Sequence, residues 1–110
     1  MKKIILAAVA SALIAGPAAA DGHGVKIGVL LGFTGPIESL APDMALAAEL
    51  AMKEVTDSGA FMGGKSVSAV RGDSTCIDSA AATATAERLI TSDKVSGIMG
   101  ADCSGVTIAT

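Results

Sequence analysis

Two short segments hold the residues of this chain that could bind a small ligand. Residues 100–105 (GADCSG) contain Ser104, and residues 32–36 (GFTGP) place a threonine between glycines. If Ser104 opens a helix, its hydroxyl and the free backbone N–H groups of the first helical turn form an array that binds a carboxylate without a basic side chain. The alternative is that Ser104 only caps its own helix. Residues 32–36 either let a ligand approach the backbone or simply allow a tight exit from a strand.

Catalytic chemistry finds little support among the residue types. Residues 32–36 match neither the GxGxxG pattern nor a P-loop, because no GK[ST] follows. His23 is the only histidine, so a serine triad would need a substitute base. A carboxylate cluster is conceivable, but loop and capping roles explain each candidate, namely Asp73, Asp78 and Asp102. We therefore expect neither an enzyme nor a metal site or cofactor.

The first 20 residues have the order of features found in an export signal. A basic start at residues 1–3 precedes an uncharged apolar run over 4–16, which is too short to cross a bilayer as a lasting helix. Pro17 breaks this run, and the alanines at 18–20 suit a signal peptidase. The pattern predicts cleavage before Asp21; the alternatives are a short signal anchor or a core helix.

The part of the chain after residue 20 is acidic. Its six basic and 11 acidic residues give a net charge of −5, which argues against a nucleic-acid partner and against binding to an anionic membrane surface. Its 90 residues can form one small domain. Because Trp and Tyr are absent and only two phenylalanines occur, the core must be aliphatic.

The two cysteines, Cys76 and Cys103, predict a disulfide. An even count of cysteines in an oxidising compartment is typical of disulfide pairing. Two thiols and His23 fall short of a four-ligand metal site, so metal binding is the weaker alternative. In the chain-entropy model, closing a loop of this length stabilises the fold by roughly 3–4 kcal/mol.

Strand and helix patterns alternate along the rest of the chain. Residues 25–31, 65–71 and 95–99 read as strands; the first is apolar enough for burial on both faces, and the second alternates as an edge strand does.

Helical patterns cover residues 43–58, 79–92 and 104–110. Gly59 is placed to end the first helix, and Asp78 or the serine after it can cap the second. Apolar residues at helical spacing predict the faces that pack on the sheet: Met44, Ala48, Ala51 and Val55 in the first helix, and Ala82, Ala86 and Leu89 in the second.

This alternation predicts an α/β fold, a doubly wound parallel sheet with right-handed crossovers. In such a sheet the ligand crevice lies past the carboxyl ends of the strands, where residues 32–40 and 100–104 would meet. The loop with Cys76 leaves from the same edge, so a bond to Cys103 would brace the crevice wall. The chain stops inside a predicted helix, and a sheet of three strands leaves an edge strand unpaired. We therefore expect this chain to be a fragment of a longer protein.

Three stretches in register resemble a known family. They are residues 25–55 (VKIGVLLGFTGPIESLAPDMALAAELAMKEV), residues 73–80 around Cys76, and residues 86–105 (AERLITSDKVSGIMGADCSG). Together they look like the start of the branched-chain amino acid (leucine/isoleucine/valine) periplasmic binding proteins, which are type I solute-binding proteins of ABC transporters. In that family two α/β lobes close around the ligand, in a protein several times longer than this chain.

The resemblance implies a domain organisation and a fold class. Residues 1–20 would be the signal peptide, and residues 21–110 the truncated N-terminal part of the first ligand-binding lobe. The implied fold is a parallel, doubly wound βαβαβ(α) portion of lobe 1.

The resemblance also implies the residues that bind ligand. Ser104 matches the serine whose hydroxyl and amide hold the ligand carboxylate, and Asp102 matches a residue that offers its backbone carbonyl to an ammonium group. Leu40 matches a position that lines the side-chain pocket and often holds an aromatic residue. Leu40 is aliphatic and Asp102 is charged where apolar residues are common, which leaves the ligand's identity open. The whole implied set is Ser104, Asp102, Cys103, Thr34, Gly35, Leu40 and Thr107, with Cys76 and Cys103 as the disulfide pair.

The expected function follows from this resemblance. It is the periplasmic component of an ABC importer that binds an amino acid, branched-chain or similar aliphatic, and delivers it to the permease in the inner membrane. We expect a monomer that needs no cofactor. The alternatives are an amide- or urea-type binder or ligand sensor on the same scaffold, and a Rossmann-like exported enzyme, which the missing phosphate fingerprint disfavours. A further alternative is that this segment alone is an incomplete domain that binds nothing tightly.

Overall fold

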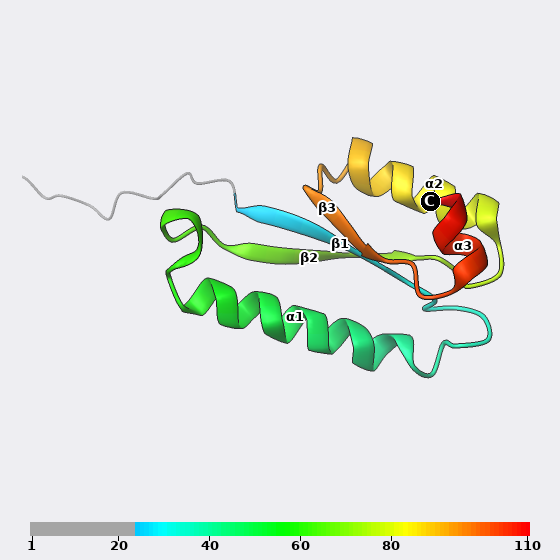
Figure 1. Ribbon diagram of the computed structural model, residues 1–110, viewed down its shortest axis with the longest axis horizontal. Helices are drawn as coiled ribbons and strands as arrows, with labels where there is room; N and C mark the ends of the chain where they lie inside the picture. The colour runs from blue at the N-terminus through cyan, green and yellow to red at the C-terminus, as the bar shows by residue number, and fades with distance from the viewer. Residues whose placement is uncertain (1–23) are drawn as a thin grey trace, which may run out of the picture.

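A computed structural model describes residues 24–110, and a three-stranded parallel sheet lies at its centre (Figure 1). The middle strand is β1 (Val25–Leu31), with β2 (Val67–Asp73) on one side and β3 (Gly97–Gly100) on the other. The predicted signal peptide, its cleavage point and the lone histidine lie outside the described residues.

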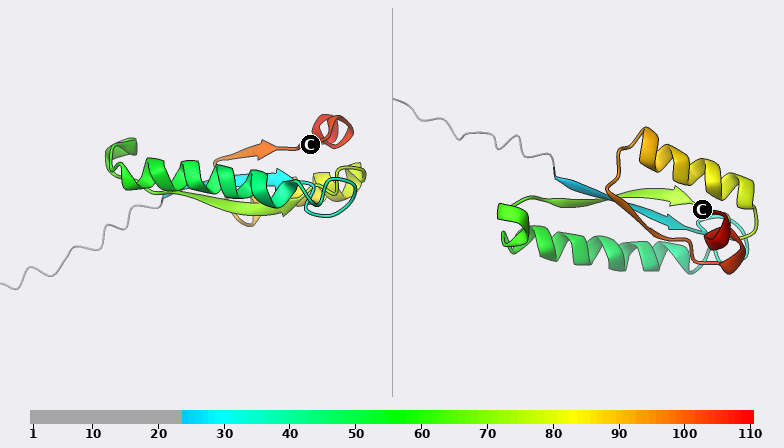
Figure 2. Two further views of the ribbon diagram at one scale, coloured as in Figure 1. Left: turned by 90° about the horizontal axis from the view of Figure 1, so that it is seen from below. Right: turned by 45° about the horizontal axis from the view of Figure 1, so that its top comes forward.

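Helices cover both faces of this sheet (Figures 1 and 2). After β1 the chain passes through α1 (Ala41–Asp57) and a short 3₁₀ turn, η1 (Phe61–Gly63), to β2. It then returns through α2 (Ser79–Thr91), on the opposite face, to β3, and α3 (Ser104–Ala109) follows. This order confirms the predicted doubly wound α/β fold.

The second half of β1 is buried because each of its faces packs on a different helix. Successive side chains of a strand point to opposite faces. Val29 and Leu31 pack toward α1, and Leu30 between them packs toward α2. All three are almost fully buried. The uncharged run that follows Lys26 is what a strand covered on both faces requires.

α2 approaches the sheet closely because the strand beneath it carries a glycine. A Cβ atom at Gly72 would lie 2.7 Å from the Thr85 side chain and 3.0 Å from that of Leu89, so only glycine leaves room for the helix. The residues of α2 that are buried against the sheet are the predicted ones, Ala82, Ala86 and Leu89.

Local chemistry sets where the two long helices begin. The carboxylate of Asp78 accepts hydrogen bonds of 3.0 Å from the backbone N–H groups of Ala80 and Ala81, so Asp78 is the cap of α2. α1 begins at Ala41, two residues earlier than predicted, because Pro42 fits in a first helical turn, where its missing N–H is not needed.

The face of α1 that packs on the sheet agrees with the prediction only in part. Ala48 packs there as predicted, but Ala51 is exposed and Met44 and Val55 are 43% and 39% exposed. Apolar residues also occupy the outer side of this helix, where Leu46 and Leu50 are 55% and 57% exposed, so the apolar pattern does not single out one face. The residues that are buried or partly buried against the sheet are Ala41, Ala45, Ala48 and Met52.

β2 and β3 each begin two residues later than predicted. The backbone N–H of Lys65 donates to the carbonyl of Phe61 in the preceding turn, and that of Val95 donates to the carbonyl of Leu89 at the end of α2. These two N–H groups are therefore committed to turns and are not available to the sheet ladder.

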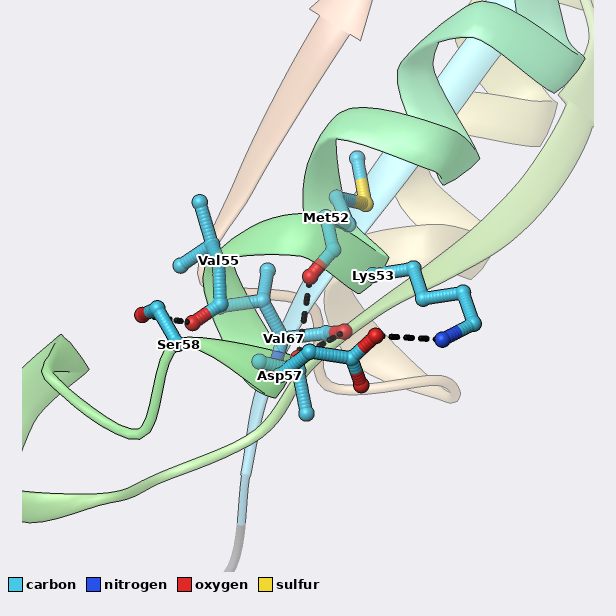
Figure 3. A network of polar contacts seen from close by, with 7 residues as sticks. Met52, Lys53, Val55, Asp57, Ser58 and Val67 are labelled. Carbon is cyan, nitrogen blue, oxygen red and sulfur yellow. Dashed lines mark hydrogen bonds and ion pairs between the residues drawn. The ribbon is translucent and has the colours of Figure 1, made fainter.

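Polar contacts hold the end of α1 to the start of β2 (Figure 3). The backbone N–H of Val67 donates to the hydroxyl oxygen of Thr56 at 2.8 Å, and that hydroxyl donates to the carbonyl of Met52 at 2.9 Å. Lys53 and Asp57 form an ion pair on the outer side. This network lies at the amino edge of the sheet, because β2 starts there. Within residues 24–110 no helix combines the length and the apolar character needed to cross a membrane.

Candidate functional site

Three loops gather at the carboxyl edge of the sheet: residues 32–40 after β1, residues 74–78 after β2 and residues 101–103 after β3 (Figures 1 and 2). β1 and β3 are neighbours, and the crossovers that leave β1 and β2 run over opposite faces. The predicted crevice position, where the strand order reverses, is therefore between the first and third loops.

A disulfide joins the second loop to the third. Cys76 and Cys103 are bonded with an S–S distance of 2.01 Å and a Cα–Cα distance of 5.2 Å, and this confirms the predicted pair. Cys103 is also the N-cap residue of α3. The bond therefore fixes the start of α3, directly before Ser104.

The carboxylate of Asp102 connects all three loops by hydrogen bonds. One oxygen accepts from the backbone N–H of Gly32 at 2.7 Å, and the other accepts from the hydroxyl of Ser74 at 3.2 Å. Ser74 is fully buried, and its oxygen also accepts from the backbone N–H of Cys76 at 3.3 Å. Each oxygen of the Asp102 side chain thus accepts a hydrogen bond from another loop.

Asp73, the last residue of β2, holds the tip of the first loop. Its carboxylate accepts from the hydroxyl of Thr34 at 2.6 Å, from the backbone N–H of Thr34 at 3.2 Å and from that of Thr75 at 2.9 Å. Partial burial raises the pKa of Asp73, but these hydrogen bonds outweigh it and hold the pKa below its usual value. Asp73 therefore stays ionised at neutral pH.

The first two loops also touch through their backbones. Gly35 has φ +90°, a conformation that favours glycine, and a Cβ atom there would lie 2.4 Å from the carbonyl oxygen of Thr75. The glycine after Thr34 is thus required by this contact as well as by the turn.

α3 presents its first turn at the same edge. Ser104 is the first helical residue and is exposed, while Cys103 occupies the cap position. The proposal that Ser104 only caps its own helix is therefore not supported. The Thr107 hydroxyl lies 2.6 Å from the carbonyl of Ala101 and 2.9 Å from that of Cys103, and so stabilises the turn into α3.

The predicted ligand-binding residues fall into two groups. The contacts above bring one group to the carboxyl edge of the sheet: Thr34 and Gly35 on the first loop, and residues 102–107 on the third loop and α3. Leu40 takes part in none of these contacts; it is the N-cap residue of α1 and is 59% exposed.

Sequence reasoning missed an ion pair beneath the first loop. Arg71 donates from Nε to one oxygen of Glu49 at 2.6 Å and from Nη2 to the other at 2.9 Å, and its guanidinium lies 5.5 Å from the centre of the Phe33 ring. The hydrogen bond from Arg71 lowers the pKa of Glu49, against a smaller effect of burial. Residues 22 positions apart meet here, and no local pattern signals such a pair.

The described residues offer one further place where a ligand could be sought. An apolar hollow lies beside α1 and the sheet, lined by residues that include Ile27, Met52, Val55 and Met99, but it lacks the polar groups that orient a small ligand. Within residues 24–110 no three His, Cys, Asp or Glu side chains lie together as metal ligands do. The carboxyl-edge loops remain the best-supported site.

The chain is similar to known proteins in sequence and in fold. The sequence model of a family described as periplasmic binding protein matches residues 24–110. The Leu/Ile/Val-binding protein homolog 7 of Brucella melitensis is 39% identical over 111 residues, which cover 99% of this chain and 26% of the relative. The chain therefore spans about a quarter of the length of the curated relatives that it matches.

Solved structures share the fold. The branched-chain amino acid transporter substrate binding protein LivJ of Streptococcus pneumoniae, in complex with isoleucine, superposes with a TM-score of 0.69 at 29% identity, over 78% of this chain and 24% of LivJ. A solute binding protein of an ABC transporter from R. palustris, in complex with benzoate, gives a TM-score of 0.60 at 31% identity, over 78% of this chain and 23% of that one.

Proposed function

Because the chain belongs to the periplasmic binding protein family, we propose that the whole protein is the solute-binding component of an ABC importer. It binds an amino acid, branched-chain or similar aliphatic, and delivers it to a permease in the inner membrane. Residues 1–20 act as the signal peptide, cleaved before Asp21, and residues 21–110 form the N-terminal part of the first lobe. The mature protein works in the periplasm as a monomer.

The ligand carboxylate binds at the start of α3 in this proposal. The Ser104 hydroxyl and the N–H groups of the first turn donate to it. The backbone carbonyl of Asp102 accepts from the ammonium group, Thr34 and Gly35 form the opposite wall, and Leu40 lines the side-chain pocket. The observation that carries the proposal is the junction of the first and third loops at the strand-order reversal, with Ser104 exposed beside it.

In this proposal, transport requires the protein to bind the ligand and to close its two lobes around it, and no covalent bond is made or broken. Ligand held between this lobe and a second one stabilises the closed arrangement, and so shifts a hinge equilibrium. The closed form is the one that the permease receives. No acid–base pair or nucleophile is required of the loop residues, so the protein is not an enzyme.

One observation favours a second candidate ligand class. The R. palustris protein that is 31% identical was solved with benzoate, which shares a carboxylate with amino acids but lacks the ammonium group. An aromatic carboxylate could use the Ser104 turn equally well. It would leave the carbonyl of Asp102 without a partner, which is unfavourable for a buried acceptor.

Ligand titration of the full-length exported protein tests the proposal. We expect L-isoleucine to bind and to raise the unfolding temperature, since ligand at 100 times its Kd adds about 2.7 kcal/mol of stability. Benzoate should give no shift. Binding of benzoate alone would establish the second candidate, and no stabilisation by either compound, or by leucine and valine, would contradict the proposed ligand classes.

A further inference from the structure

The side chain of Asp102 has a role that its proposed backbone contact does not explain. Its carboxylate is half-buried at the rim, and the ion pairs among residues 24–110 use other carboxylates. A partly buried charge without an ion-pair partner must be stabilised by hydrogen bonds. Gly32 and Ser74 supply them, one to each oxygen.

The hydrogen bond to Gly32 continues the sheet past its end. β1 and β3 are paired in parallel up to Leu30 and Gly100. Beyond this pair the two strands diverge into the loops that form the two walls of the crevice. Gly32 lies two residues after Leu30, and Asp102 lies two residues after Gly100. Here the carboxylate of Asp102 accepts from the backbone N–H of Gly32 at 2.7 Å, in place of a backbone hydrogen bond between the strands.

The other contacts at this edge do not join these two walls. The disulfide links the second loop to the third through Cys76 and Cys103. Asp73 links the first loop to the end of β2 through Thr34. The contact between Asp102 and Gly32 is the side-chain hydrogen bond that spans the first and third loops directly.

We propose that Asp102 is a positioning residue, whose carboxylate sets the spacing between the Thr34–Gly35 turn and the Ser104 helix start. Its effect on ligand affinity rests on the proposed function; the contact with Gly32 does not. The two carboxylate oxygens accept from Gly32 and from Ser74, one each. Asparagine keeps one accepting oxygen for Gly32, but its NH2 group can only donate to Ser74, so the Ser74 hydroxyl would have to turn its own proton elsewhere.

The test uses the full-length protein with Asp102→Ala, Asp102→Asn and the control Asp57→Asn, which removes a charge at the opposite edge of the sheet. Amide hydrogen exchange is followed at Gly32, with Val29 in the strand interior reporting overall stability. Asp102→Ala should raise the exchange rate at Gly32 about tenfold or more and leave Val29 little changed. Asp102→Asn should fall between Asp102→Ala and the wild type, and Asp57→Asn should match the wild type.

Affinity for L-isoleucine supplies the second measurement. We expect Asp102→Ala to weaken binding about tenfold, equivalent to about 1.4 kcal/mol, with a smaller loss for Asp102→Asn. Unchanged exchange at Gly32 would overturn the proposal. Unchanged affinity for L-isoleucine in a variant whose Gly32 amide exchanges faster than in the wild type would also overturn it. If Asp102→Ala does not fold, the same criteria apply to Asp102→Asn. If the wild type does not bind L-isoleucine, the proposed ligand class fails, and exchange at Gly32 still decides whether the contact exists.

Discussion

Cys76 and Cys103 are joined by a disulfide, and Cys103 is at the same time the N-cap residue of α3. The bond spans 27 positions of sequence and crosses from the loop after β2 to the loop after β3. Because the helix that begins at Ser104 is short, it contributes little stability of its own. Its position at the carboxyl edge is held by this covalent link together with α2, against which Val106 is buried and whose Thr83 hydroxyl donates to the carbonyl of Ala109 at 3.1 Å.

Removing the disulfide should destabilise the protein without changing its fold. For a loop of 27 positions the chain-entropy model gives about 3.5 kcal/mol. Urea unfolding of the full-length Cys76→Ala/Cys103→Ala variant should show this loss against the oxidised wild type. A reducing agent should lower the midpoint of the wild type and leave the double variant unchanged; equal midpoints for the two oxidised proteins would contradict the prediction.

The contribution of Asp73 to stability should depend on pH. The pKa of Asp73 is lower in the folded protein than the value of about 3.8 expected in the unfolded chain. The stability that its ionised form provides is therefore present above pH 3.8 and is lost as the pH falls through the folded pKa. Asp73→Asn should cost roughly 1–3 kcal/mol at pH 7 and clearly less at acid pH.

Urea unfolding at pH 7 and at about pH 3 measures this difference. Thr34→Val provides the control, because it removes the hydroxyl that donates to Asp73. In the Thr34→Val background the effect of Asp73→Asn should shrink, as coupling between contacting residues requires. An equal cost at both pH values would show that the ionised carboxylate does not stabilise the loop.

Much of this fold could be predicted because its signals are local. The apolar run of β1 and the face of α2 with Ala82, Ala86 and Leu89 follow from spacing alone, and both were correct. The cap at Asp78 likewise depends on residues two and three positions away. In α1 the same reasoning was right for Ala48 only, because the exposed Leu46 and Leu50 on the outer side widen the apolar pattern.

The contacts that assemble the site could not be predicted in the same way. Asp102 meets Gly32 at a separation of 70 positions and Ser74 at 28. The family resemblance pointed to Asp102 for its backbone and gave no role to its side chain. Only the strand order brings these residues together, and a hydrogen bond between loops leaves no periodic trace in the sequence.

Gly35 should tolerate no side chain. A Cβ atom there meets the carbonyl oxygen of Thr75 at 2.4 Å, in addition to the strain of φ +90°. Gly63 has φ +75° with open space around its Cβ position, so Gly63→Ala is a control matched for backbone strain. Gly35→Ala should destabilise by about 1–3 kcal/mol more than Gly63→Ala in urea unfolding. Equal losses would mean that the loops move apart freely.

Ser104→Ala should weaken ligand binding while leaving stability nearly unchanged. Ser104 is exposed and lies in the first turn of α3, so its hydroxyl is available to a ligand carboxylate in the proposed function. A hydrogen bond to a charged group contributes roughly 1.5–3 kcal/mol, which corresponds to a loss of affinity of about tenfold to a hundredfold. Titration calorimetry with L-isoleucine on the full-length protein measures it. Ser96→Ala, an exposed serine before β3 at the amino edge, should bind like the wild type. If both variants bind equally well, the carboxylate is held elsewhere, and the start of α3 is not the ligand site.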